Sequence, residues 1–158
     1  MASTLKVNTI QHTGGTSAMT IDSSGRILTP NRPAFQGLSD TKQSSGNYLF
    51  TNFSTSGSGA CNRGNHFNAT TGIFTAPVAG IYNFGFIFGE TAGGSGRKIG
   101  IVFINGVATS QQVAEGSEAY NDVGSSMVME LSANDEISVG THSSLQWNRC
   151  TFSGFLIG

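Results

Sequence analysis

Charged side chains are scarce in this chain, and their near balance excludes several classes of partner. Only 11% of the 158 residues are charged, and the formal net charge is −1. Binding to nucleic acid depends on clustered Lys and Arg that neutralise phosphates, and the sequence has neither such a cluster nor an acidic tail. We therefore expect no nucleic-acid partner, and expect any external partner to be a protein or a glycan.

Long apolar runs are also missing. The opening residues, MASTLKVNTIQHTGG, lack the apolar stretch of a signal peptide, and nothing later approaches a membrane span. We expect a chain that makes no use of a membrane or a signal peptide and is assembled in a cytoplasm. Cys61 and Cys150 could bridge a loop to the last strand, but in a reducing compartment two such distant cysteines are more often free thiols.

Patterns for catalysis and metal binding are lacking as well. The three histidines stand apart, and neither HxxxH nor Cys-x-x-Cys occurs. Asp122, Asp135 and Glu136 are too few for the roughly six to eight oxygen ligands of calcium, and we interpret them as turn and cap residues. Neither a Gly-x-Ser-x-Gly motif nor a set of paired carboxylates indicates a hydrolase. The sequence predicts a protein that is not an enzyme and has no cofactor.

Aromatic residues at strand spacing are abundant. From Gly80 the chain alternates, so that one side of a strand carries four aromatic rings, those of Tyr82, Phe84, Phe86 and Phe88. Further short segments of strand character are separated by Gly, Ser and Asn turns, near residues 34–38, 48–53, 66–75, 80–89, 98–105, 108–114, 123–131, 136–142 and 150–157. This pattern predicts an all-β sandwich or jelly roll.

The first 33 residues have a different character. Short β-rich runs at 5–10, 18–22 and 26–29 are separated by glycine-containing turns, which predicts a small β meander. Pro30 to Pro33 form a stiff linker. We therefore predict two parts, a meander with its linker over residues 1–33 and a jelly-roll domain over residues 34–158.

Two motifs in the second part identify a family. The first consists of Phe67, Phe74, Pro77, Gly80, Tyr82, Phe84 and Phe86, and the second of Phe152, Ser153, Gly154, Phe155 and Leu156. Together they resemble the globular C1q domain of the C1q/TNF-like superfamily, over residues 34–158. The resemblance implies a ten-stranded jelly roll and a compact homotrimer with the C-terminal strand near its centre. Some relatives bind calcium at the trimer apex, but no ligand set for it is visible here. The 22 glycines show no every-third-residue period, so the collagen stalk common in that family is absent from this sequence.

Two predicted strands are apolar on both sides, which favours a trimer. Ile99, Ile101 and Phe103 alternate with Val102 and Ile104, while Phe152 lies on the opposite side from Phe155 and Ile157. A monomeric sandwich needs only one apolar side per strand, so the second side requires a cover. We expect that cover to be another copy of the chain; the alternative is a monomer covered by its own loops. The candidates for the core or the trimer contact are Tyr82, Phe84, Phe86, Phe103, Phe152 and Phe155, and the sequence leaves open which side faces the axis. We expect Ala at Phe84 or Phe155 to cost about 3–5 kcal/mol.

The N-terminal part carries a second resemblance. The segment LKVNTIQHTGGTSAMTIDSSGRILTPNRPAF is similar to N-terminal modules of virion fibre and appendage proteins of tailed bacteriophages. A meander this short is marginal alone, so its apolar residues are candidates for docking to other virion proteins, namely Leu5, Val7, Ile10, Met19, Ile21 and Ile27.

These observations predict a non-enzymatic homotrimeric structural protein of a phage particle. We expect a tail-fibre or appendage head that attaches to the host surface; the alternative is a capsid decoration, cement or head-fibre trimer. Trp147 is a candidate for stacking on a host glycan, with a buried loop aromatic as the competing interpretation.

Overall fold

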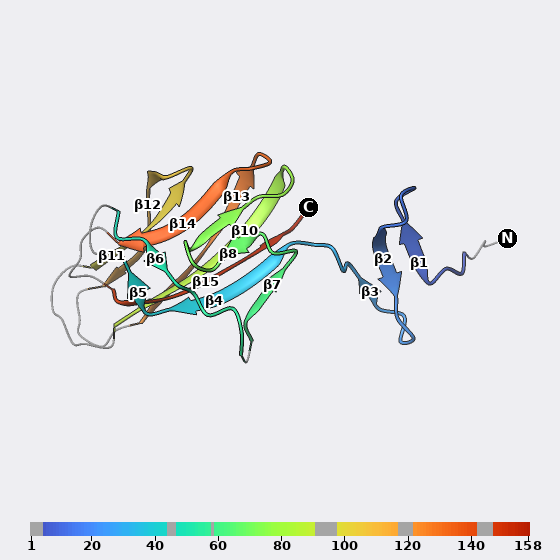
Figure 1. The fold of residues 1–158 in the computed structure, drawn as a ribbon, viewed down its shortest axis with the longest axis horizontal. Helices are drawn as coiled ribbons and strands as arrows, with labels where there is room; N and C mark the ends of the chain where they lie inside the picture. The colour runs from blue at the N-terminus through green and yellow to red at the C-terminus, as the bar shows by residue number, and fades with distance from the viewer. Residues whose placement is uncertain (1–4, 44–46, 58, 91–97, 117–121, 142–146) are drawn as a thin grey trace. The chain divides into compact units, whose positions relative to one another are not determined.

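The chain forms two compact units, Met1–Arg32 and Pro33–Gly158, both built from β-strands (Figure 1). The computed structural model describes residues 5–43, 47–57, 59–90, 98–116, 122–141 and 147–158. Helices are absent from these described residues, so none of them belongs to a helix that could cross a membrane.

The N-terminal unit is an antiparallel meander of β1 (Thr9–Gln11), β2 (Ser17–Ile21) and β3 (Ile27–Leu28). Asp22 fixes the turn between β2 and β3, because its Oδ1 accepts hydrogen bonds from the backbone N–H groups of Ser24 (2.9 Å) and Arg26 (3.0 Å). Its Oδ2 accepts a further bond of 2.7 Å from Nε of Arg26. These hydrogen bonds lower the pKa of Asp22, those from Arg26 most. The first strand begins at Thr9, later than the predicted residue 5.

The second unit is a sandwich of two five-stranded sheets with a short hairpin of β5 and β6. The first sheet has the order β13-β10-β15-β4-β7, and the second has the order β12-β11-β14-β9-β8. The strands are β4 (Ala34–Ser39), β5 (Thr41–Lys42), β6 (Phe50–Thr51), β7 (Cys61–Arg63), β8 (Phe67–Asn68), β9 (Ile73–Thr75), β10 (Gly80–Gly89), β11 (Lys98–Ile104), β12 (Val107–Gly116), β13 (Val123–Leu131), β14 (Glu136–Thr141) and β15 (Arg149–Leu156). The predicted all-β jelly-roll sandwich is confirmed.

Two predicted strands are interrupted in the structure. The segment 66–75 divides into β8 and β9, because Oδ1 of Asn68 accepts bonds from the backbone N–H groups of Thr70 (3.1 Å) and Thr71 (3.2 Å) and closes a turn. Gly72 completes this turn with a φ of +73°, and a Cβ there would lie 2.2 Å from the carbonyl oxygen of Phe50. The segment 48–53 shortens to β6, since Asn52 follows with a φ of +53°.

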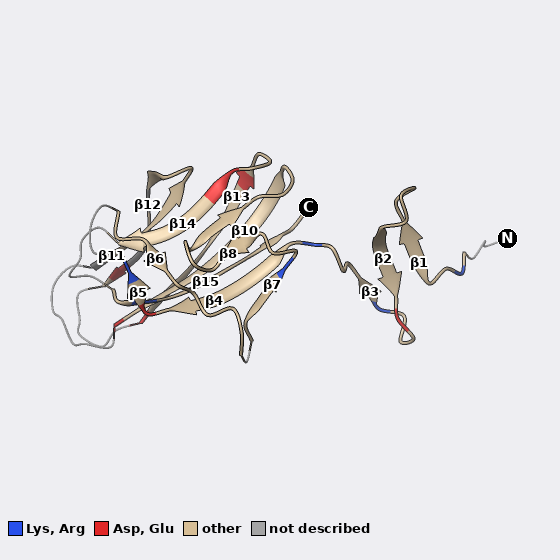
Figure 2. Ribbon diagram, viewed as in Figure 1, with Lys and Arg blue, Asp and Glu red and all other residues tan. Residues whose placement is uncertain are grey.

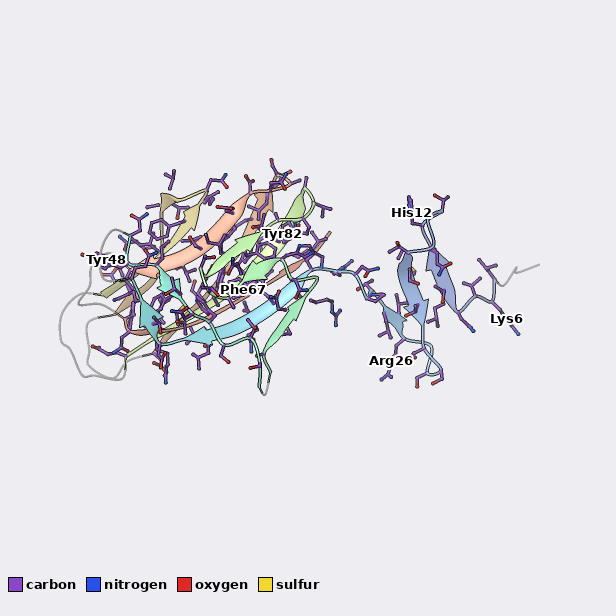
Figure 3. The ribbon with its side chains drawn as sticks, viewed as in Figure 1. Lys6, His12, Arg26, Tyr48, Phe67 and Tyr82 are labelled. Atoms are coloured by element: carbon purple, nitrogen blue, oxygen red, sulfur yellow. The ribbon has the colours of Figure 1, made fainter. Side chains whose placement is uncertain are left out.

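The core between the sheets is mainly aromatic. The ring of Phe35 from the first sheet stacks on that of Phe67 from the second, with centroids 4.4 Å apart, and meets Phe152 edge-on at 4.8 Å. Tyr82 packs edge-on against Phe74 at 5.6 Å and donates its hydroxyl to the carbonyl of Val78 (2.8 Å). Figure 3 labels Phe67 and Tyr82 within the sandwich, where both are almost fully buried. Such ring pairs contribute about 0.5–1.5 kcal/mol each beyond their area burial.

Both ends of the second unit lie at one end of the first sheet. The backbone N–H of Leu156 donates to the carbonyl of Pro33 (3.2 Å), and that of Ile81 donates to the carbonyl of Gly158 (2.8 Å). Gly89, at the far end of β10, pairs instead with Arg149 at the start of β15. The chain therefore enters and leaves the sandwich at the end where β10 begins.

Candidate functional site: the outer face of the first sheet

The outward side of the first sheet carries large apolar side chains that none of the described residues covers. Alternation along β10, β13 and β15 sends one set of side chains into the core and the other set outward. The outward apolar residues are between 44% and 60% exposed: Leu38, Ile81, Ile87, Val128, Phe155 and Ile157. We call this surface the outer face.

Strand register arranges the outer face in levels. At one level Ile87 of β10 pairs with Thr151 of β15, which pairs with Leu38 of β4. Nearer the end where β10 begins, Phe155 lies between Asn83 of β10 and Ala34 of β4. The two levels form separate apolar zones on one surface.

Small polar residues separate these zones. Gly85 pairs with Ser126 on one side and with Ser153 on the other. Ser153 donates its hydroxyl to the carbonyl of Gly85 (3.3 Å). A Cβ on Gly85 would lie 2.8 Å from Oγ of that serine, so the small serine side chain occupies the space beside the glycine. The middle of the outer face therefore carries only glycine and serine on these three strands, and such small side chains let another surface approach the sheet.

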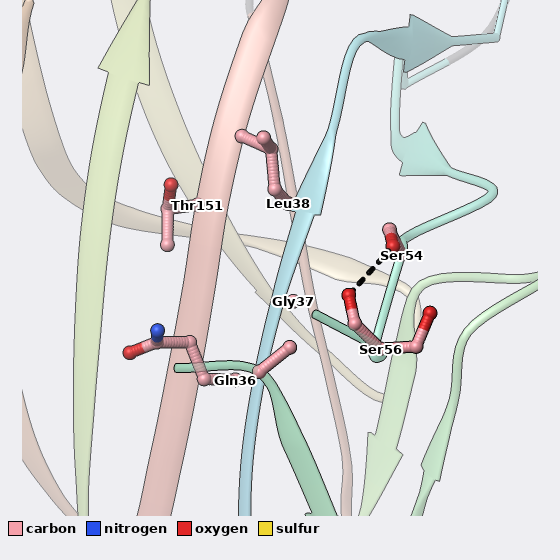
Figure 4. Close-up of a pocket in the computed structure, with 7 residues that line it drawn as sticks. Gln36, Gly37, Leu38, Ser54, Ser56 and Thr151 are labelled. Carbon is pink, nitrogen blue, oxygen red and sulfur yellow. Dashed lines mark hydrogen bonds between the residues drawn. The ribbon is translucent and has the colours of Figure 1, made fainter. Parts of the chain in front are cut away.

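A cavity of about 280 Å³ lies beside the apolar zone of Leu38 (Figure 4). Gln36, Leu38 and Thr151 supply its sheet side, and Ser54, Ser56 and Ala60 supply its other wall. Ser54 donates its hydroxyl to the carbonyl of Ser56 (3.2 Å), which fixes that wall. The sequence did not predict this cavity, because its walls come from segments far apart in the chain.

Comparison with known proteins identifies the domain. A model of the C1q domain matches residues 34–157. The chain belongs to the C1q domain family. C1q domains commonly form trimers. Residues 1–33 lie outside the match, and we use the name C1q domain for the second unit from here on.

Two animal proteins illustrate this similarity. The collagen alpha-1(X) chain of Mus musculus is 34% identical over 105 residues, which are 61% of this chain and 15% of that collagen chain. The globular domain of zebrafish complement 1qA protein superposes with a TM-score of 0.61 at 19% identity, covering 80% of this chain and 98% of that structure. The collagen is thus far longer than the region matched, and the complement domain shows the shared fold. Neither name denotes an enzyme.

The structure separates the predicted core or trimer candidates into two groups. Tyr82, Phe84, Phe86 and Phe152 lie inside the sandwich and are fully or almost fully buried. Phe155 points the other way and is 48% exposed on the outer face. The predicted loss of about 3–5 kcal/mol for Ala therefore applies to Phe84 and is corrected for Phe155, whose ring is only half-buried in the single chain.

Phe103 requires a correction too. It lies on the outward side of β11, opposite Val102, yet it is only 2% exposed. The reason lies at Gly140 on the neighbouring strand. A Cβ there would be 2.7 Å from the carbonyl oxygen of Asn47 and 3.1 Å from the ring of Phe103. The chain around Asn47 and Tyr48 thus folds back over this side of the second sheet. Phe103 needs no second copy to cover it, contrary to the prediction.

Trp147 does not present its ring to a glycan. Its side chain is 0% exposed and belongs to the core cluster of the C1q domain. Its backbone carbonyl accepts a 2.9 Å hydrogen bond from Nζ of Lys42. The prediction of a glycan contact is corrected, because burial removes the ring face on which a sugar stacks.

Lys42 places its ammonium group among residues at one end of the sandwich. Its Nζ also donates to Oγ1 of Thr141 (3.2 Å) and lies 6.0 Å from the ring centroid of Phe50. Burial lowers the pKa of Lys42 to about 8, while the charge of Glu90 acts in the opposite direction. Sequence reasoning missed this site, since nothing in the sequence around Lys42 indicates burial.

This shift predicts a pH dependence of stability. Unfolded Lys42 keeps an ordinary pKa of about 10.4, so between about pH 8 and 10 the unfolded chain binds more protons than the folded one. The cost of holding the ammonium group is fully present below about pH 8 and is relieved as the pH rises. We expect the unfolding free energy of the wild type, minus that of Lys42→Met, to increase from pH 7.5 to pH 10 in urea titrations. A constant or falling difference would contradict the prediction.

Carboxylates and cysteines in the described residues form no metal site. No group of three or more His, Cys, Asp or Glu in the described part of the chain could hold an ion. Asp135 closes a turn, accepting bonds from Nδ2 of Asn105 (2.9 Å) and the backbone of Ser132 (2.8 Å), which lower the pKa of its carboxyl. Cys61 is exposed and Cys150 is buried, both as free thiols. Burial raises the pKa of the Cys150 thiol well above its usual range.

The predicted docking residues lie in the N-terminal unit. Leu5, Ile10, Ile21 and Ile27 are exposed, with Leu5 and Ile27 at 82% and 64%. Val7 and Met19 are half-buried, and Met19 pairs with Ile10 across β1 and β2. The unit thus presents apolar side chains that its own strands leave accessible.

Proposed function

We propose that this chain is a non-enzymatic homotrimeric structural protein of a tailed phage particle. Its C1q domain forms an appendage head that adheres to a host surface glycan or protein. The observation that carries the proposal is the outer face, where apolar side chains from β4, β10, β13 and β15 stand exposed on a well-filled sandwich. Exposed apolar zones of this kind mark interaction sites, and obligate interfaces are more apolar than ordinary surface.

The outer face supports self-association in particular. In the second sheet the large outward aromatic, Phe103, is already covered by its own chain. Among the described residues, the exposed large apolar side chains of the sandwich gather on the first sheet, whereas the strands of the second sheet expose Val107. In an oligomer whose rotation axis runs in front of the first sheet, the outer face of every copy is buried. C1q domains commonly form trimers, which makes three copies the expected number.

The division into two units supports the rest of the proposal. The C1q domain carries the trimer contact, and the N-terminal meander attaches the trimer to the particle through Leu5, Ile10, Ile21 and Ile27. The resemblance of residues 5–35 to phage appendage modules points to a virion assembled in the host cytoplasm. Three heads on one axis raise the apparent affinity for a repetitive surface by roughly 10² to 10⁴ without new contacts.

The test compares the full chain with residues 33–158 alone. We expect light scattering at micromolar concentration to give the mass of three chains for both, and only the full chain to be incorporated into particles. Ile27→Asp in the full chain is the matched variant, which keeps the trimer but reduces incorporation. A monomeric full chain would overturn the proposal. Incorporation of residues 33–158 would place docking in the C1q domain and favour a capsid decoration trimer.

A further inference from the structure

The first sheet carries opposite charges at its two edges, on the same side as the outer face. Glu130 lies on β13 at one edge, and Arg63 lies on β7 at the other. Both are exposed, and both alternate with inward-facing neighbours, Met129 and Asn62. Figure 2 shows the acidic segment of β13 and the basic segment of β7 on different edges of the sandwich.

We infer that Glu130 of one copy pairs with Arg63 of the next copy, and that this ion pair closes the ring of subunits around the outer face. The inference rests on the proposed homotrimer and adds the residues that join its neighbouring copies. Rotation about an axis parallel to the strands brings the β13 edge of one copy to the β7 edge of the next. Such a heterologous contact needs two different, complementary edges.

The two residues lie at nearly the same level of the sheet. Arg63 pairs with Ala34, Ala34 with Phe155, Phe155 with Asn83, and Asn83 with Val128. Glu130 is two residues beyond Val128, about 7 Å farther along the strand. A rotation about such an axis leaves every level unchanged, and the long side chains of Glu and Arg span the remaining offset. Arg63 is also at the level of Phe155, which lies two strands away on the central strand β15.

Neither charge has an ion-pair partner among the residues that the structure describes in its own chain. Arg149, which also lies on β15 in the first sheet, is paired with Asp122 at 2.7 Å. Arg63 and Glu130 therefore remain available to a neighbour. An exposed ion pair is worth about 0.2–1 kcal/mol, but a trimer contains it at each of its contacts.

The experiment is a charge exchange in the full chain. Glu130→Lys and Arg63→Glu each place like charges at every contact, and the double variant restores opposite charges in the reverse order. We expect each single variant to raise the concentration at which the trimer half-dissociates by about tenfold or more, measured by analytical ultracentrifugation. The double variant should return to within about threefold of the wild type. Glu136 is an exposed carboxylate on β14 of the second sheet. Glu136→Lys is therefore the control for Glu130→Lys, since it makes the same change in net charge, and it should behave as the wild type.

The outcomes separate the two proposals. Trimers as stable in both single variants as in the wild type would overturn the ion pair and leave the homotrimer intact. A double variant as weak as the single variants would show that the two residues do not meet, which also overturns the pair. A monomeric wild type would overturn the homotrimer together with the pair. Loss in the single variants with recovery in the double variant supports the inference.

Discussion

Phe84→Ala is expected to lower the unfolding free energy by about 3–5 kcal/mol, which is a large part of the stability of a domain this size. Phe84 is 0% exposed and contacts rings from both sheets, with Phe74 at 5.6 Å and Phe152 at 6.0 Å between centroids. It also lies against bare backbone, since a Cβ on Gly154 would be 2.5 Å from its ring. A close-packed site of this kind collapses poorly, so the cavity left by the ring adds to the lost burial.

Urea titration at one pH measures this loss. Phe84→Leu is the matched variant, which keeps much of the apolar volume and should cost clearly less than Ala. Phe155→Ala in a monomeric background should cost only about 1 kcal/mol, because half of that ring is already in water. A loss below about 1 kcal/mol at Phe84 would show that the core does not depend on its ring.

Phe155→Asp is expected to abolish the trimer without unfolding the chain. The ring is 48% exposed in the single chain and lies on β15, the central strand of the first sheet. A carboxylate buried there in every copy would lack a partner, and truncating a central interface residue already costs about 2 kcal/mol or more. We expect the concentration for half-dissociation to rise about a hundredfold or more, with the mass of one chain at micromolar concentration.

The control for this variant is Val107→Asp. Val107 is 70% exposed on β12 of the second sheet, away from the outer face. The Val107→Asp variant makes the same change from an apolar to an acidic side chain and should remain a trimer. Far-ultraviolet circular dichroism should show β structure in both variants. If Phe155→Asp still has the mass of three chains, the outer face is not the trimer contact.

Local periodicity predicted the strands that the core requires. The range 80–89 for β10 followed from the alternation that puts aromatic rings on one side, and 123–131 for β13 followed from its strand character between turn residues. The structure has the same bounds. β10 and β13 pair with each other over nearly their whole length. Regular pairing keeps the alternation unbroken, so the sequence position of each residue indicates which side of the sheet it faces. The segment 66–75 failed this reasoning because Asn68 and Gly72 close a turn inside an otherwise strand-like run.

Local sequence patterns could not predict which strand surfaces are covered by segments that lie far away in the chain. Alternation indicated that β11 is apolar on both sides, but not that the chain near Asn47 covers one of them. The same limit applies to Trp147 and Lys42, which meet through a hydrogen bond across 105 positions in the chain. The sequence therefore predicted which residues are apolar, whereas only the fold distinguishes the outer face from a surface that is already covered.

The common position of the two ends of the sandwich makes the C1q domain a one-sided display scaffold. Pro33 and Gly158 lie at the end where β10 begins, joined to Leu156 and Ile81 by backbone hydrogen bonds. The strand ends at Gly89, Val123 and Arg149 lie together at the opposite end. Peptides grafted between strands there would project away from any segment fused before Pro33 or after Gly158. Such fusions could hold a cargo or an anchor without obstructing the grafted epitopes.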